Sequence, residues 1–63
     1  MNIQSAVIEG TSVLKNKSII SAQLDTEILM AQALGKSREY IILNHDKVLN
    51  IDNLEYFKKL VHE

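Results

Sequence analysis

The chain has 63 residues, 46% of them apolar, which allows one small domain with a single compact core. Cysteine is absent, so disulfide frameworks and thiolate metal sites are excluded, and two histidines alone are too few for a zinc site. Seven basic residues balance eight acidic ones, which argues against a surface that neutralises nucleic-acid phosphates. Because the sequence has neither a membrane-length apolar run nor a signal peptide, we expect a cytoplasmic protein.

The first predicted helix spans about residues 3–16. Ile3, Val7 and Leu14 recur at helical spacing. Asn2 precedes them and carries a side chain that can accept the first free backbone N–H groups. Gly10 lies in the middle, where it either weakens the helix or marks a point of close packing.

The second predicted helix spans about residues 22–34. Ser21 offers an N-cap, and Asp25 and Glu27 place negative charge in the first turns, as the helix dipole favours. Gly35 follows the last apolar residue and is a natural left-handed stop. Both ends of this helix are therefore marked in the sequence.

Apolar residues cover several faces of this second helix. They form three rows, Leu24, Ile28 and Ala31, then Leu29 and Ala33, then Met30 and Leu34. So wide an apolar surface is typical of the central helix of a bundle. We therefore expect this helix at the centre of the fold, with Leu29 in the core.

Two further helices are predicted, over about 38–44 and 51–62. Ser37 and Asn50 are their N-caps. The apolar run 40–43 is compatible with a strand, but no other segment alternates with period two to pair with it. The last helix has no Gly or Pro stop, so we expect a fifth helix beyond the C-terminus. The predicted fold class is an all-α bundle of four helices in a single domain.

No arrangement of residues in this chain points to catalysis. Asp25 and Glu27 are two positions apart, so they diverge by about 200° around a helix. His45 and Asp46 are loop neighbours without a nucleophile, and no phosphate loop or dinucleotide motif is present. We therefore predict no catalytic, cofactor-binding or metal-ligating residue, and do not expect this chain alone to be an enzyme.

One spacing suggests a DNA-binding module. Ala31, Gly35 and Ile41 resemble the helix-turn-helix signature. In that motif a small residue allows close helix packing, a glycine makes the turn and an apolar residue packs the second helix against the first. The positions that would face a groove are Ser37, Arg38, Glu39, Ile42, Leu43 and Asp46. Two acidic and two large aliphatic side chains beside a single arginine are poorly suited to bind phosphates or base edges. Helix-turn-helix binding remains an alternative, and a free-standing helical interaction module is another.

A longer resemblance starts at Ile20. The run ISAQLDTEILMAQALGKSR, ending at Arg38, resembles the N-terminal helical domain of release factor glutamine methyltransferases, the HemK or PrmC family. Members typically show Ser-Ala-Arg-Leu-Asp-Ala-Glu-Leu-Leu-Leu-Ala, then Leu-Gly and an Arg. The matching motif positions here are Ser21, Leu24, Asp25, Glu27, Leu29 and Gly35. Gln23 replaces the usual Arg, and Asn50-Ile51 occupies the place of a frequent Thr-Pro.

The resemblance implies a role in protein methylation. Enzymes of that family transfer a methyl group from S-adenosylmethionine to the Gln of the Gly-Gly-Gln motif in class I peptide chain release factors. Their Rossmann-like catalytic domain carries an Asn-Pro-Pro-Tyr motif, whereas this chain contains no proline. Residues 1–63 would then be the domain that helps to dock the release factor. Its partners would be that factor and the catalytic domain, and some members are also fused to a tRNA guanine-N7 methyltransferase.

Three cations are candidates for contact with a partner. Lys36, Arg38 and Lys47 are predicted at one loop end of the bundle, where they could meet an acidic surface or form a solvated rim. Asp25 and Glu27 could complement the helix dipole, bridge to a neighbouring helix or contact the partner directly. The residues by themselves leave these readings open.

Overall fold

The computed structural model describes residues 1–63 and contains four helices and no strand. They are α1 (Ile3–Asn16), α2 (Ala22–Leu34), α3 (Arg38–Leu43) and α4 (Ile51–His62). The all-α prediction is confirmed. The third helix ends one residue earlier than predicted, because the backbone of Asn44 leaves the helical region while its N–H still donates to the Tyr40 carbonyl. None of these helices has the length and apolar character needed to cross a bilayer.

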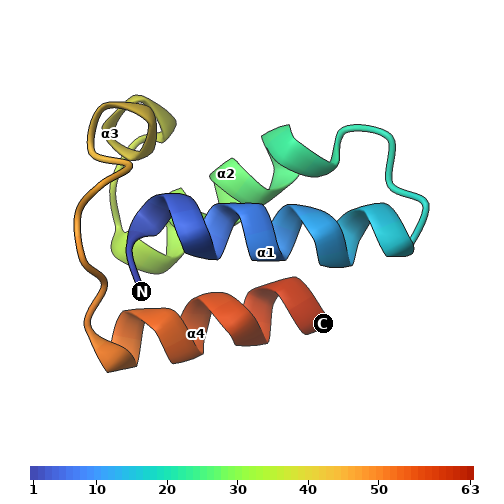
Figure 1. Cartoon of the computed structure of the whole chain (residues 1–63). Coiled ribbons are helices and arrows are strands. Elements are labelled where there is room, and N and C mark those ends of the chain that lie inside the picture. The colour runs from blue at the N-terminus through green and yellow to red at the C-terminus, as the bar shows by residue number, and fades with distance from the viewer.

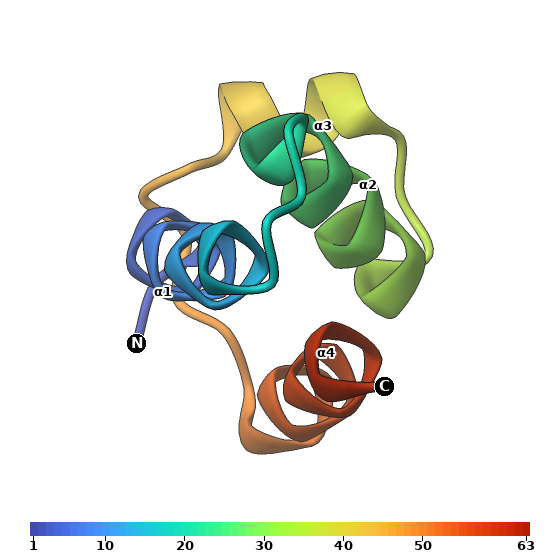
Figure 2. The same cartoon turned by 90° about the vertical axis from the view of Figure 1, so that its right-hand side faces the viewer.

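Three of the helices surround a common core and the fourth closes one end. Figure 1 shows α1 and α4 side by side with α2 behind α1, and α3 crossing at the end where the chain turns toward α4. Figure 2 looks along the bundle, with α1, α2 and α4 around the centre and α3 above α2. Because α2 packs against each of the other three helices, its predicted central position is confirmed.

Short polar side chains start three of the helices as predicted. The Oδ1 atoms of Asn2 and Asn50 accept backbone N–H groups three residues ahead, both at 2.8 Å. The Ser37 hydroxyl accepts the Tyr40 N–H at 3.2 Å. Each cap satisfies a donor that the first turn of a helix leaves without a partner.

The predicted N-cap at Ser21 is wrong. Its side chain makes no capping hydrogen bond, because its backbone (φ −94°, ψ 42°) is not in the extended conformation that a capping residue adopts. The hydroxyl instead donates to Oδ2 of Asp25 at 3.2 Å. The other end of α2 is as predicted, with Gly35 in the left-handed region at φ 65°.

Only part of the apolar surface of α2 faces inward. Met30 and Ala33 are buried, and Leu29 is half-buried against the same core. Leu24 and Ile28 remain 42% and 48% exposed. The core joins all four helices and consists of Ile3, Ala6, Met30, Ala31, Ala33, Ile41, Leu49, Phe57 and Val61. The helix is central as predicted, but Leu24 and Ile28 of its first row are left for solvent or a partner, whereas Ala31 of that row is buried.

Gly10 is the point of closest approach among the three long helices. A Cβ atom at Gly10 would lie 2.8 Å from Cγ2 of Thr26 on α2 and 2.9 Å from Cζ of Phe57 on α4. Contacts below 3 Å require something to move, so any larger residue would force Thr26, Phe57 or the helices themselves to shift. Of the two sequence readings of Gly10, the structure supports close packing.

The start of α1 is anchored on the loop between α3 and α4. The N–H groups of Ile3 and Gln4 donate to the carbonyls of Lys47 and His45 at 2.9 and 2.7 Å. Asn2 and Val48 form an isolated antiparallel bridge. These bonds satisfy donors at the helix start and hold Lys47 and Val48 beside the start of α1.

Candidate interaction surfaces

The three predicted cations separate into two groups. Arg38 donates through Nε to Oε1 of Glu27 at 2.9 Å, which ties the first turn of α3 to α2. The Glu27 side chain is 12% exposed and that of Arg38 is 47% exposed. Glu27 therefore forms the salt bridge to a neighbouring helix that was one of the roles predicted for it from the sequence. Asp25 accepts a hydrogen bond from the Ser21 hydroxyl instead.

Lys36 and Lys47 meet instead on one aromatic residue. Their Nζ atoms lie 5.3 and 5.5 Å from the centroid of the Tyr40 ring, and that of Lys36 is within the range of cation–π attraction. Lys47 also donates through Nζ to the Tyr40 hydroxyl at 3.1 Å. Lys36 comes from the α2–α3 turn and Lys47 from the α3–α4 loop, so the fold brings together cations eleven positions apart in the sequence.

These side chains line a groove that we call the lysine–tyrosine groove. Its polar rim comprises Lys36, Tyr40, Lys47, Asn50 and Asn53, and its apolar part comprises Ile3, Leu34, Val48 and Leu49. The end of α2, the α3–α4 loop and the first turn of α4 form its walls. The rim therefore combines two ammonium groups, a phenol and two amides above an aliphatic floor.

A second groove, the isoleucine groove, lies where α1, α2 and α3 meet. Ile8 and Ile42 line it and are exposed, and Gln23, Glu27 and His45 contribute polar groups to its lining. Members of the family that the sequence resembles usually carry Arg at the position of Gln23. In this chain an uncharged amide lines the groove there. This combination of apolar side chains and polar lining groups is typical of interfaces that exclude water at their centre.

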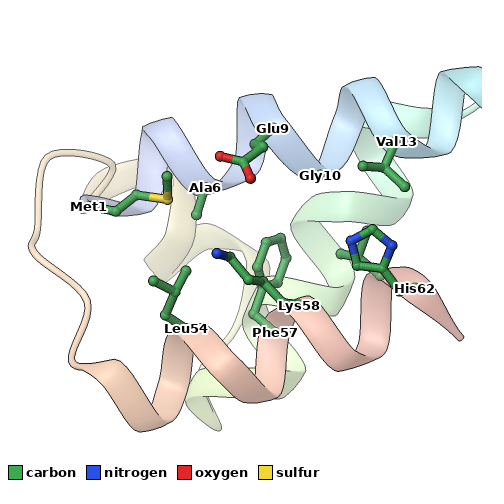
Figure 3. A pocket seen from close by; sticks show the side chains of 10 residues that line it. Met1, Ala6, Glu9, Gly10, Val13, Leu54, Phe57, Lys58 and His62 are labelled. Atoms are coloured by element: carbon green, nitrogen blue, oxygen red, sulfur yellow. The ribbon is translucent and has the colours of Figure 1, made fainter.

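A third hollow runs between α1 and α4. Figure 3 shows the Phe57 ring pointing from α4 toward Gly10, with Ala6 and Leu54 beside it and Lys58 and His62 at the rim. Because the aromatic ring occupies the space that the glycine leaves, this hollow belongs to the packing of the bundle.

The remaining polar residues form no reactive arrangement. His45 and Asp46 are exposed on the α3–α4 loop, and no three His, Cys, Asp or Glu side chains gather to hold a metal ion. The helix-turn-helix reading also gains little from the geometry. The helix that would enter the DNA groove is α3, which has six residues. The one cation of α3, Arg38, forms an ion pair with Glu27.

The sequence did not single out Tyr40, which was counted only within the apolar run 40–43. Lys36 and Tyr40 are four apart, but Ser37 between them is extended (ψ 163°), so this is not the helical spacing that brings side chains together. The contact with Lys47 depends on the path of the α3–α4 loop, which follows from the bridge between Asn2 and Val48. No short-range pattern encodes that bridge.

Comparison with known proteins agrees with the resemblance read from the sequence. The family model described as the PrmC N-terminal domain matches residues 5–63. The chain is 34% identical over 61 residues to a release factor glutamine methyltransferase of Clostridium botulinum, which covers 97% of this chain and 22% of that protein. It is 33% and 32% identical over 60 residues to bifunctional methyltransferases of Rickettsia conorii and Rickettsia felis, covering 95% of this chain.

The chain spans only a small share of these relatives, 12% and 11% of the two rickettsial proteins. No solved structure matches it.

Proposed function

This chain belongs to the PrmC N-terminal domain family, and on that premise we propose that it is the non-catalytic N-terminal domain of a release factor glutamine methyltransferase. The observation that carries the proposal is the similarity to a protein of that name over 97% of the chain. The aligned span reaches from the first to the last helix, so the likeness concerns the whole fold rather than one motif.

The chemistry is assigned to a part of the protein outside these 63 residues. S-adenosylmethionine and the Gln of the Gly-Gly-Gln motif would both bind in that catalytic domain. The role proposed for residues 1–63 is to hold a class I peptide chain release factor while the reacting groups align. A second attachment point raises the effective concentration of the substrate glutamine at the catalytic centre.

The geometry supports a binding role in two ways. The lysine–tyrosine and isoleucine grooves both present side chains that the core of the bundle does not use. Both also rest on well-packed helices, since Ile3 and Ile41 lie beneath them and are buried. Surfaces supported in this way meet a partner with little rearrangement, which lowers the entropic cost of binding.

An NMR titration tests the proposal. The ¹⁵N-labelled chain is mixed with a class I release factor and, in parallel, with duplex DNA. We expect chemical-shift changes confined to one face of the bundle with the release factor and none with DNA. No change with the release factor would contradict the docking role. Salt-sensitive changes with DNA alone would favour the helix-turn-helix reading.

A further inference from the structure

We propose that the lysine–tyrosine groove is a binding site for the carboxylates of an extended acidic segment of a protein partner. The inference rests on the proposed function only for the source of that segment, which we expect to be the release factor. Its physical basis is a set of hydrogen-bond donors that the fold gathers in one place and leaves without an anionic partner.

The first donors are the two ammonium groups. The Nζ of Lys36 lies 5.3 Å from the centroid of the Tyr40 ring and that of Lys47 lies 3.1 Å from its hydroxyl, and neither has a carboxylate within 4.0 Å. The one ion pair of the fold, between Arg38 and Glu27, does not involve them. Both ammonium groups therefore contact the same tyrosine and are available to an incoming anion.

The phenol and an amide add uncharged donors. The Tyr40 oxygen accepts the Lys47 ammonium at 3.1 Å, so its own O–H proton remains available to a second acceptor. Oδ1 of Asn50 accepts the Asn53 N–H at 2.8 Å, which leaves the NH₂ group of Asn50 as a donor. The groove also opens at the first turn of α4, a 12-residue helix whose dipole is positive there.

The backbone beside the groove suits an extended segment. Val48 pairs with Asn2 through bonds made by the flanking residues, Ile3 to Lys47 and Leu49 to Met1. In such a bridge the N–H and C=O of Val48 itself point away from Asn2, and they have no partner in the fold. Its side chain is 76% exposed. An extended peptide can pair with this edge while its carboxylates reach the lysines.

An acidic peptide fits the groove better than a nucleic acid does. The Lys36 ammonium lies 5.3 Å from the centroid of the Tyr40 ring, where a base would have to displace it to stack. Glu39 and Asp46, neighbours of Tyr40 and Lys47 in the sequence, are exposed and limit how many anionic groups the groove can accept, which disfavours a continuous phosphate backbone more than a segment with one or two carboxylates. Two lysines can neutralise two carboxylates but not a strand of phosphates.

The site is tested with a hexaglutamate peptide and a hexaglutamine control, titrated into the ¹⁵N-labelled chain. We expect saturable shifts at Lys36, Tyr40 and residues 47–50 with hexaglutamate and none with hexaglutamine. The shifts should diminish when the ionic strength rises from about 0.05 to 0.3 M, because salt screens exposed charges. Equal shifts around Lys15, Lys58 and Lys59 would overturn the proposal, since they would mean general attraction to lysines.

Matched variants locate the interaction. Lys36→Gln/Lys47→Gln should weaken hexaglutamate binding about tenfold or more, since two charge-assisted contacts are lost. Lys58→Gln/Lys59→Gln removes the same charge at the far end of α4 and should leave binding unchanged. Tyr40→Phe keeps the ring and should weaken binding a few-fold. Equal losses in both double variants would overturn the proposal, as would tighter binding of a single-stranded DNA hexamer at Tyr40. The amide spectrum of each variant verifies folding.

The same variants in the release-factor titration separate this inference from the proposed function. If the release factor binds the parent and Lys36→Gln/Lys47→Gln equally well, the groove is not its docking site while the docking role stands. If hexaglutamate binds at the groove and the release factor does not bind at all, the carboxylate site stands and the docking role fails.

Discussion

Where α1 crosses α2 and α4, the chain uses its smallest residue, whereas along α3 and the loop that follows it large aliphatic and long cationic side chains remain in solvent. At the crossing, Gly10 leaves room for the Thr26 methyl group and the Phe57 ring, and all three residues are buried. At the α3 edge, Ile42 and Val48 are exposed.

The difference shows how a 63-residue domain divides its tasks. Stability depends on a few closely packed contacts, because a chain of this size buries little surface and has a core worth only about 3–5 kcal/mol. The side chains of the α3 edge contribute little to that core and are available for a partner. Substitutions at the crossing should therefore change the free energy of unfolding, and substitutions at the edge should change binding.

The largest effect is expected for Phe57→Ala. Phe57 is 2% exposed and joins α4 to the crossing, so its loss should cost about 3–5 kcal/mol, which approaches the whole stability of the domain. Urea unfolding followed by circular dichroism measures the change. Tyr56→Ala is the matched control, since Tyr56 is 45% exposed and should cost far less. Similar losses in both variants would contradict the assigned packing of α4.

Gly10→Ala should destabilise the domain by about 1–2 kcal/mol. Alanine favours the helix by up to about 1 kcal/mol, but its methyl group must displace Thr26 or Phe57, and overpacking costs about 1–3 kcal/mol. Thr26→Ser removes the methyl group that lies 2.8 Å away, so Gly10→Ala should cost less in that background. A double-mutant cycle on thermal unfolding measures this coupling. A Gly10→Ala protein more stable than the parent would show that the helix crossing has room for a methyl group.

Two residues with positive φ should respond in opposite directions. Gly35 ends α2 at φ 65°, and a Cβ atom there would have no neighbour within 4 Å, so Gly35→Ala should cost about 1 kcal/mol through backbone strain alone. Ser18 has φ 63°, and Ser18→Gly should leave stability equal or higher because it relieves that strain. Midpoints of urea unfolding report both changes, and a stabilising Gly35→Ala would contradict the left-handed turn.

The smallest effect is expected for the ion pair between Arg38 and Glu27. One partner is half exposed, so a double-mutant cycle with Arg38→Gln and Glu27→Gln should give a coupling of about 0.2–1 kcal/mol. The coupling should shrink in about 0.5 M salt, because solvent ions screen the pair. A larger, salt-independent value would mean that α3 depends on this contact for its docking.

Much of the fold could be read from the sequence because helix ends are local. The caps at Asn2, Ser37 and Asn50 each act within three residues, and the stop at Gly35 depends on one backbone angle. Ser21 shows the limit of such reasoning. Its residue type suits a cap, but the turn that leads into α2 gives it a different backbone angle.

The sequence by itself determined the helices, their order, the central place of α2 and the family resemblance. The tertiary structure alone decided which apolar row of α2 faces the core and that Lys36 and Lys47 converge on Tyr40. The reason is distance along the chain. Helical spacing and caps act over a few residues, whereas the positions of Leu24 and Lys47 depend on how α1, α3 and the N-terminal bridge pack together.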